Sequence, residues 1–252
     1  MTTRKHILAL TAALGLLAFA GCSTPGPNHV YVGAKADATI LDLSTGKPEA
    51  DVPSFLFSPY NLYAIAYDPF TDHLFLRIVP GNAVRVIDRP ARNIKYDFVA
   101  EGLPEGAGDL AIRSSDRDLF FGHPTKPMLV ETTLRGKHVR DITLEGLTGA
   151  PGGVAYDQKL DRFFILGGGE SAKITSYTLD GKHQGAVSLD RHVRPASLAF
   201  DSVAREFYVP LEDESAIGIF NLKGHLLRTL PVPATQNLSH VDVGERSLIR
   251  LF

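Results

Sequence analysis

Several side chains and motifs that often mark a function are scarce or missing from this sequence of 252 residues. A single cysteine excludes a disulfide framework within the chain. The chain has no His-x-His, His-Glu-x-x-His or paired-cysteine pattern of a zinc site, and no Gly-x-Ser-x-Gly motif of a serine hydrolase. Its 26 basic residues are balanced by 28 acidic ones, without the basic excess of a nucleic-acid-binding protein. We therefore expect no nucleic acid among its partners.

An uncharged apolar run at residues 7–20 follows Arg4 and Lys5. A run of 14 residues is too short to cross a bilayer comfortably, but it suits the apolar region of an export signal peptide. The run ends in Phe-Ala-Gly-Cys at residues 19–22, which resembles the lipobox of bacterial lipoproteins, where small residues precede an obligatory cysteine. Phe19 departs from the Leu, Val or Ile that is usual in that family.

The lipobox resemblance implies that residues 1–21 are removed and that Cys22 carries diacylglycerol, which attaches the protein to a membrane. Residues 22–28 would then be a lipidated Pro/Gly tether. Ser23, where an aspartate would favour the inner membrane, implies an outer-membrane protein facing the periplasm if the host is Gram-negative. The alternative is an ordinary cleaved signal peptide with a cysteine there by chance.

The rest of the chain repeats with a period of about 44 residues. Each copy has an apolar–Ala–apolar triplet, a polar turn and a second apolar run, followed by a third, alternating stretch and a weaker fourth one. The four clearest copies begin at residues 64, 109, 153 and 197. A fifth copy at residues 240–252 has Asp242 in place of the alanine. Four of the five turns after the third stretch contain a glycine, which accepts positive φ: Gly46, Gly136, Gly181 and Gly224.

Four short strands every 44 residues, without a helical period, predict a single all-β propeller of four-stranded blades over residues 29–252. A β-sandwich gives no reason for such a repeat. Five copies of the innermost strand favour five blades. We expect residues 240–243 to supply the innermost strand of a blade whose outer strands come from residues 29–57, because pairing the two chain ends removes an exposed strand edge. The alternative is six blades, with the last one built from residues 240–252 alone.

Two kinds of known repeat resemble segments of this chain. Residues 29–47 and 206–224 are similar to the YVTN-type repeat of bacterial surface and periplasmic propellers, and residues 150–157 look like the opening of an NHL-type repeat. Together the likenesses cover nearly all of residues 29–252. They imply the propeller fold and leave the activity open, because this fold carries both binding modules and enzymes.

Polar residues that recur at equivalent positions of several copies are expected to have structural roles. Three aspartates end the first strand and should cap the following turn through carboxylate–amide hydrogen bonds: Asp68, Asp157 and Asp201. Three histidines share an equivalent turn and should face solvent: His138, His183 and His225.

The residues that open each innermost strand should meet at one mouth of the central channel. The polar ones, with one loop residue, form our candidate ligand site: Asn61, Asp109, Ser197 and His240. A carboxylate, a hydroxyl and an imidazole can hold a polar ligand or a divalent metal, although polar residues also gather at wet channel mouths without a function. Loops with Glu170, His192 and Arg194 are expected at the same end.

Two classes of function fit this sequence. In the first, the propeller is a non-enzymatic binding or scaffolding module for a protein or small ligand and needs no cofactor. In the second, it is a metal-dependent hydrolase or lyase. The gluconolactonase-like propellers are similar in fold and hold Ca²⁺ through Glu, Asn and Asp at the channel mouth. Asp109, Asn61 and Glu170 match that set in type but not in spacing.

Overall fold

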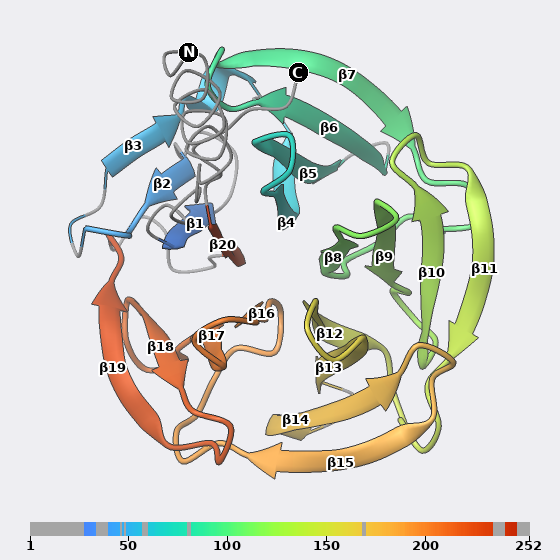
Figure 1. Ribbon diagram of the computed structural model, residues 1–252, viewed down its shortest axis with the longest axis vertical. Helices are drawn as coiled ribbons and strands as arrows, with labels where there is room; N and C mark the ends of the chain where they lie inside the picture. Colours follow the sequence, from blue (N-terminus) through green and yellow to red (C-terminus); the bar gives the residue numbers. More distant parts are fainter. Residues whose placement is uncertain are drawn as a thin grey trace, which may run out of the picture.

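The computed structural model describes residues 28–33, 40–45, 47, 49–56, 60–79, 82–167, 170–233 and 240–245. These residues form five four-stranded antiparallel sheets. Figure 1 shows the sheets arranged as the blades of a ring, with the innermost strand of each sheet near the axis and the outermost strand at the periphery. The propeller of five blades is therefore confirmed. Residues 1–27, which include the lipobox at residues 19–22, lie outside the described residues.

We number the blades in the order in which the chain enters them. Blade 1 contains β20 (His240–Glu245), β1 (Asn28–Gly33), β2 (Ile40–Asp42) and β3 (Glu49–Val52). Blade 2 contains β4 (Asn61–Asp68), β5 (His73–Val79), β6 (Ala83–Asp88) and β7 (Asn93–Val99). Blade 3 contains β8 (Leu110–Arg113), β9 (Asp118–Gly122), β10 (Met128–Thr133) and β11 (His138–Thr143). Blade 4 contains β12 (Pro151–Asp157), β13 (Arg162–Gly167), β14 (Glu170–Thr178) and β15 (His183–Ser188). Blade 5 contains β16 (Ala199–Asp201), β17 (Glu206–Pro210), β18 (Ala216–Phe220) and β19 (Leu226–Pro231).

Blade 1 combines the two ends of the described chain. β20 is its innermost strand and pairs antiparallel with β1 along its whole length, from Asn28 opposite Glu245 to Gly33 opposite His240. Val241 in β20 packs into the apolar core between blades 5 and 1. The expected closure of the ring by terminal strands is therefore confirmed.

The apolar core is divided into five clusters, one between each pair of neighbouring blades. Because side chains alternate along a strand, each innermost strand contributes to the clusters on both of its sides. In β4, Ala66 packs toward blade 3, while Tyr67 packs toward blade 1 and lies 4.8 Å from the ring of Tyr31. A small residue on one face and a large one on the other fill the wedge between blades, as the sequence predicts.

The turns that follow the innermost strands share one construction. In the three turns that begin with an aspartate, its carboxylate accepts a hydrogen bond from the backbone N–H two residues later, at 3.0, 3.1 and 2.8 Å. The predicted turn-capping role of Asp68, Asp157 and Asp201 is therefore confirmed. The turns close with a residue at positive φ, which lets the next strand reverse: Asp72, Arg117, Asp161 and Arg205.

The outer rim has a second repeated contact between neighbouring blades. Glu101, just after β7, donates its backbone N–H to the carbonyl of Gly136 at 2.8 Å, and its carboxylate accepts the N–H of His138 at 3.2 Å. Glu145 and Asp190 make the equivalent contacts one and two blades later. The turn glycines at these contacts have positive φ, as expected: Gly136, Gly181 and Gly224. The histidines beside them are exposed, as predicted.

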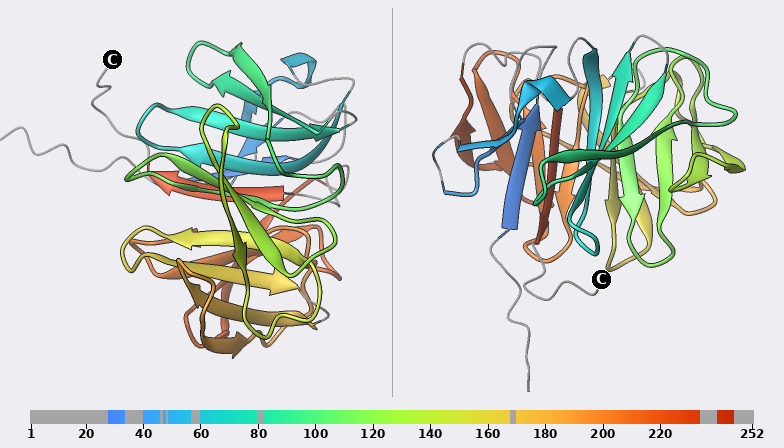
Figure 2. Two further views of the ribbon diagram at one scale, coloured as in Figure 1. Left: turned by 90° about the vertical axis from the view of Figure 1, so that its right-hand side faces the viewer. Right: turned by 90° about the horizontal axis from the view of Figure 1, so that it is seen from above.

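The two faces of the ring differ in what they carry. The described chain begins, at Asn28, and stops, at Glu245, on the face that bears the turns after the innermost strands. We call it the turn face and define it by residues 69–72, 114–117, 158–161 and 202–205. The right-hand view of Figure 2 shows the short 3₁₀ helix η1 (Ser54–Leu56) on the opposite face, which we call the mouth face. Among the described residues, no helix is long and apolar enough to cross a membrane.

Candidate functional site

Asp109 lies at the mouth end of the axis, just before β8, and is 1% exposed. Its Oδ2 accepts hydrogen bonds from the backbone N–H of Val154 in blade 4 at 3.0 Å and of Leu198 in blade 5 at 2.9 Å. Burial raises the pKa of Asp109 well above its usual range, while these N–H donors and that of Leu110 lower it. One carboxyl group from blade 3 thus holds the innermost strands of two other blades.

Ser197 extends this contact to the closing blade. The side chain is fully buried, and its hydroxyl lies 3.5 Å from Asp109 Oδ1. The same hydroxyl accepts the N–H of Val241 in β20 at 3.1 Å. Asp109 and Ser197, two of the four predicted site residues, are therefore brought together. Asn61 is exposed at the start of β4, whereas the other three are buried.

His240, the first residue of β20, makes a separate contact with blade 2. Its ring is hydrogen-bonded to the backbone of Leu62, a contact that raises the pKa of the imidazole. Burial has the larger effect and lowers the pKa of His240 to about 4, so the ring is neutral at pH 7. Within the described part of the chain, its Nδ1 is buried without a hydrogen-bond partner.

A buried arginine completes the circle between blades 2 and 3. Arg77 in β5 is fully buried, and its guanidinium donates to the carbonyl of Gly108 at 2.9 Å and to Asn82 Oδ1 at 3.1 Å. A Cβ atom at Gly108 would lie 2.3 Å from the carbonyl oxygen of Gly122, so only glycine fits there. Burial lowers the pKa of Arg77 to about 10, and the nearby Asp109 raises it.

Together these contacts join all five blades around the axis: blade 3 to blades 4 and 5, blade 5 to blade 1, blade 1 to blade 2, and blade 2 to blade 3. Asp109, Ser197 and His240 thus lie at one end of the axis, but they hydrogen-bond to the fold itself. Among the described residues, no group of three or more His, Cys, Asp or Glu side chains is placed to hold a metal ion. The side chain of Glu170 lies outside the described part.

Asp242 is a second carboxyl group at the axis, half-buried, where the equivalent residues of the other blades are alanine. Its Oδ2 accepts the N–H of Tyr67 in blade 2 at 2.6 Å, and its Oδ1 accepts the N–H of Val243 at 2.9 Å. Burial raises the pKa of Asp242 to about 7, and these two N–H donors lower it. The side chain keeps partial contact with solvent.

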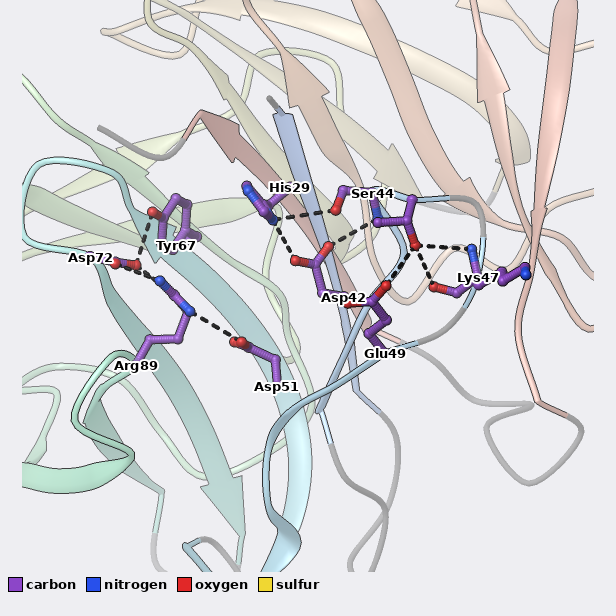
Figure 3. A network of polar contacts seen from close by, with 10 residues as sticks. His29, Asp42, Ser44, Lys47, Glu49, Asp51, Tyr67, Asp72 and Arg89 are labelled. Carbon is purple, nitrogen blue, oxygen red and sulfur yellow. Dashed lines mark hydrogen bonds and ion pairs between the residues drawn. The ribbon is translucent and has the colours of Figure 1, made fainter. Parts of the chain in front are cut away.

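The seam between blades 1 and 2 holds a polar network at the turn face (Figure 3). His29 in β1 is bound to Asp42, and the hydroxyl of Ser44 lies 3.4 Å from the same ring nitrogen. Burial raises the pKa of Asp42, but the hydrogen bonds from His29 and Ser44 outweigh it and bring the pKa to about 2. Arg89 crosses the seam, donating to Asp51 of blade 1 at 3.1 Å.

Two surface depressions between neighbouring blades are large enough for a ligand or a partner's side chains. The larger one, about 520 Å³, lies where the linker after β11 meets β14 and β15, and Glu145, Lys173, Tyr177 and His183 line it. The Tyr177 and His183 rings meet edge-on at 6.0 Å. The smaller one, about 360 Å³, is one blade further on and includes Asp190. Both combine charged groups with a histidine ring, and the larger one also has hydroxyl groups; such polar groups suit a polar ligand.

Sequence reasoning missed Arg77 and the position of Asp242. Arg77 stands inside the apolar run His-Leu-Phe-Leu-Arg-Ile-Val, at the place that Gly33 has in the preceding copy. A charged residue inside a buried strand is costly unless it is paired, so this break in the repeat was the available signal. The larger depression has no such signal, because its lining comes from segments about 30 residues apart in the chain.

Comparison with known proteins supports the fold. No protein-family model matches the chain, and no curated protein matches it. A chain from the crystal structure of the nidogen/laminin complex superposes with a TM-score of 0.61 at 10% identity, covering 86% of this chain and 98% of that one. Glutaminyl cyclase from Myxococcus xanthus gives a TM-score of 0.49 at 13% identity, covering 72% and 69%. The likeness to the nidogen/laminin chain, at 10% identity, shows the fold alone. Because 1036 solved chains match, the fold does not select a function.

Proposed function

We propose that this protein is an exported lipoprotein whose propeller is a non-enzymatic binding or scaffolding module, held at a membrane by lipid on Cys22. The observation that supports the binding role is that the channel-mouth groups bind to the fold itself. The Asp109 carboxylate, which a Ca²⁺ site of the gluconolactonase-like type would need, accepts the backbone N–H groups of Val154 and Leu198. A carboxylate held by backbone donors of two blades serves the ring rather than a substrate.

The partner is an unidentified protein or small polar ligand, and the depression lined by Glu145, Lys173, Tyr177 and His183 is its favoured place. This depression offers both charge signs, with Glu145 in the linker after β11 and Lys173 on β14, beside the exposed ring of His183 on β15. Polar ligand sites typically combine a few such convergent groups with ring surfaces. Capture from the native membrane fraction is the direct way to identify the partner.

The anchor is supported by the order of residues at the N-terminus: two basic residues, an apolar run of 14, and Phe-Ala-Gly-Cys. Ser23 favours the periplasmic face of the outer membrane in a Gram-negative host.

We predict that Cys22→Ser abolishes lipidation and membrane retention, because the chain has no other thiol to take the lipid. Incorporation of radiolabelled palmitate, followed by separation of membrane and soluble fractions, measures both effects. Ser23→Ala is the matched control and should be labelled like the unchanged protein. Palmitate labelling that persists in Cys22→Ser would exclude this anchor.

A further inference from the structure

The turn face carries large apolar side chains at the tips of three of its turns. Phe70, Leu160 and Val203 are 52%, 55% and 70% exposed. They stand in blades 2, 4 and 5, at nearly equivalent positions, so three separate points of one face are apolar. Single exposed apolar residues are ordinary on a protein surface, but their recurrence at the same turn of separate blades calls for a contact beyond the fold.

A basic residue accompanies each of these apolar tips. The Arg117 guanidinium lies 5.1 Å from the centre of the Phe70 ring. Lys159 is exposed beside Leu160, whereas Arg205, two residues after Val203, is ion-paired with Asp157, as Arg117 is with Asp68. Exposed apolar side chains beside a cation such as Lys159 suit the headgroup region of a bilayer, where the apolar part enters the acyl boundary and the cation meets lipid phosphate.

The proposed anchor would hold this same face close to the lipid. β1 starts at the turn face, and its second residue, His29, is fixed by Asp42 and Ser44 (Figure 3). Cys22 precedes Asn28 by six residues, which span at most about 20 Å when fully extended. A lipid inserted through Cys22 therefore keeps the start of β1 within that distance of the membrane.

We propose that the turn face rests on the surface of the lipid bilayer, with Phe70, Leu160 and Val203 inserted among the headgroups. This inference rests on the proposed lipid anchor at Cys22. The mouth face then points away from the membrane and stays open to a ligand or partner. The anchor, in blade 1, and the three tips, in blades 2, 4 and 5, spread the contacts around the axis and would hold it roughly perpendicular to the bilayer.

Single-cysteine variants of the lipidated full chain test this orientation, because Cys22 is consumed by the lipid and no other thiol is present. Phe70→Cys and Leu160→Cys place an environment-sensitive fluorophore on the turn face. Phe55→Cys is the matched control, since Phe55 is 71% exposed but stands in η1 on the mouth face. In vesicles of phosphatidylethanolamine and phosphatidylglycerol, we expect a blue shift and quenching by nitroxide-labelled lipid at positions 70 and 160 only.

The unchanged protein gives a second readout. Lys159 is exposed on the turn face, and Lys126 is exposed in the β9–β10 hairpin on the mouth face. Reconstitution into the same vesicles should slow modification of Lys159 by a membrane-impermeant amine reagent several-fold and leave Lys126 unchanged. Protein that is retained on vesicles but shows equal fluorescence and equal lysine reactivity on both faces would overturn the docking inference and leave the anchor standing. Protein that is not retained would overturn the anchor, and the docking inference with it.

Discussion

At the scale of single residues, Asp242 departs from the repeat in a way that has a measurable consequence. The other four blades have alanine at this place, near the axis, where an innermost strand leaves little room. The carboxyl group of Asp242 instead accepts the N–H of Tyr67, which links the closing strand to blade 2. The link requires a half-buried carboxyl group at the axis, and burial raises the pKa of this group to about 7.

The raised pKa makes the stability of the ring depend on pH. Because the folded pKa of Asp242 is above its usual value, the folded state holds this proton more tightly, and stability from this group falls as pH rises from about 4 to about 7. A shift of about three units corresponds to at most about 4 kcal/mol, and solvent contact at the side chain makes it smaller.

We therefore expect Asp242→Asn, which keeps an acceptor for Tyr67, to gain stability relative to the unchanged protein as the pH is raised from 5 to 8. Denaturant unfolding at both pH values measures the difference in unfolding free energy. His240 acts in the opposite direction: its lowered pKa makes stability fall as pH drops from about 6.5 to about 4. Both proteins share that dependence, so it cancels in the comparison. A difference that is the same at pH 5 and pH 8 would mean that Asp242 is not the titrating group.

At the scale of secondary-structure elements, β20 joins three blades although it is short. It covers the inner edge of β1, and Val241, which is 1% exposed, joins the core between blades 5 and 1. Its backbone also reaches Ser197 of blade 5, and its side chains reach Leu62 and Tyr67 of blade 2. Loss of β20 would expose β1 as an edge strand and remove the contacts that β20 makes with blades 5 and 2.

Val241→Asp should destabilise the whole domain by roughly 3 kcal/mol or more, because it places an unpaired carboxylate in an apolar cluster. Deletion of residues 240–252 should have at least the same effect. The control is Val139→Asp in β11, where the side chain is 47% exposed and the expected change is within about 0.5 kcal/mol. Thermal melting compares the three. If the deleted protein melts like the full chain, the ring is not closed by β20.

The strands and their order could be predicted from the sequence because each blade repeats the same local pattern. The spacing of 44 residues, the turn glycines and the aspartate caps are all local features, and alignment of the copies exposes them. The polar contacts across the axis could not be predicted, because they depend on which side chains from different blades lie close together. Asp109 and Leu198, for example, are 89 residues apart in the chain. The sequence could place Asp109 and Ser197 at one mouth, but not show that each binds backbone groups there.

At the scale of the whole molecule, the ring presents one face with a polar, hydrogen-bonded axis end and another whose turns carry exposed apolar side chains and charges of both signs. The mouth-end contacts join all five blades, so the buried groups of the candidate ligand site hold the scaffold together. The remaining surface, with its depressions between blades, is what a rigid binding module offers a partner. The two functions therefore predict different roles for Asp109. In a binding module it links the blades, and in a metal-dependent enzyme it is a metal ligand.

Thermal unfolding of the unchanged protein and of Asp109→Asn, each with and without Ca²⁺, separates these two roles. If Asp109 is a link between blades, the substitution weakens its hydrogen bonds to Val154 and Leu198 and costs about 2 kcal/mol, or roughly 6 °C in Tm, by the same amount in both conditions. Ca²⁺ should leave the Tm of the unchanged protein where it was. A rise of several degrees with Ca²⁺ that disappears in Asp109→Asn would contradict this account and indicate a metal site at the channel mouth.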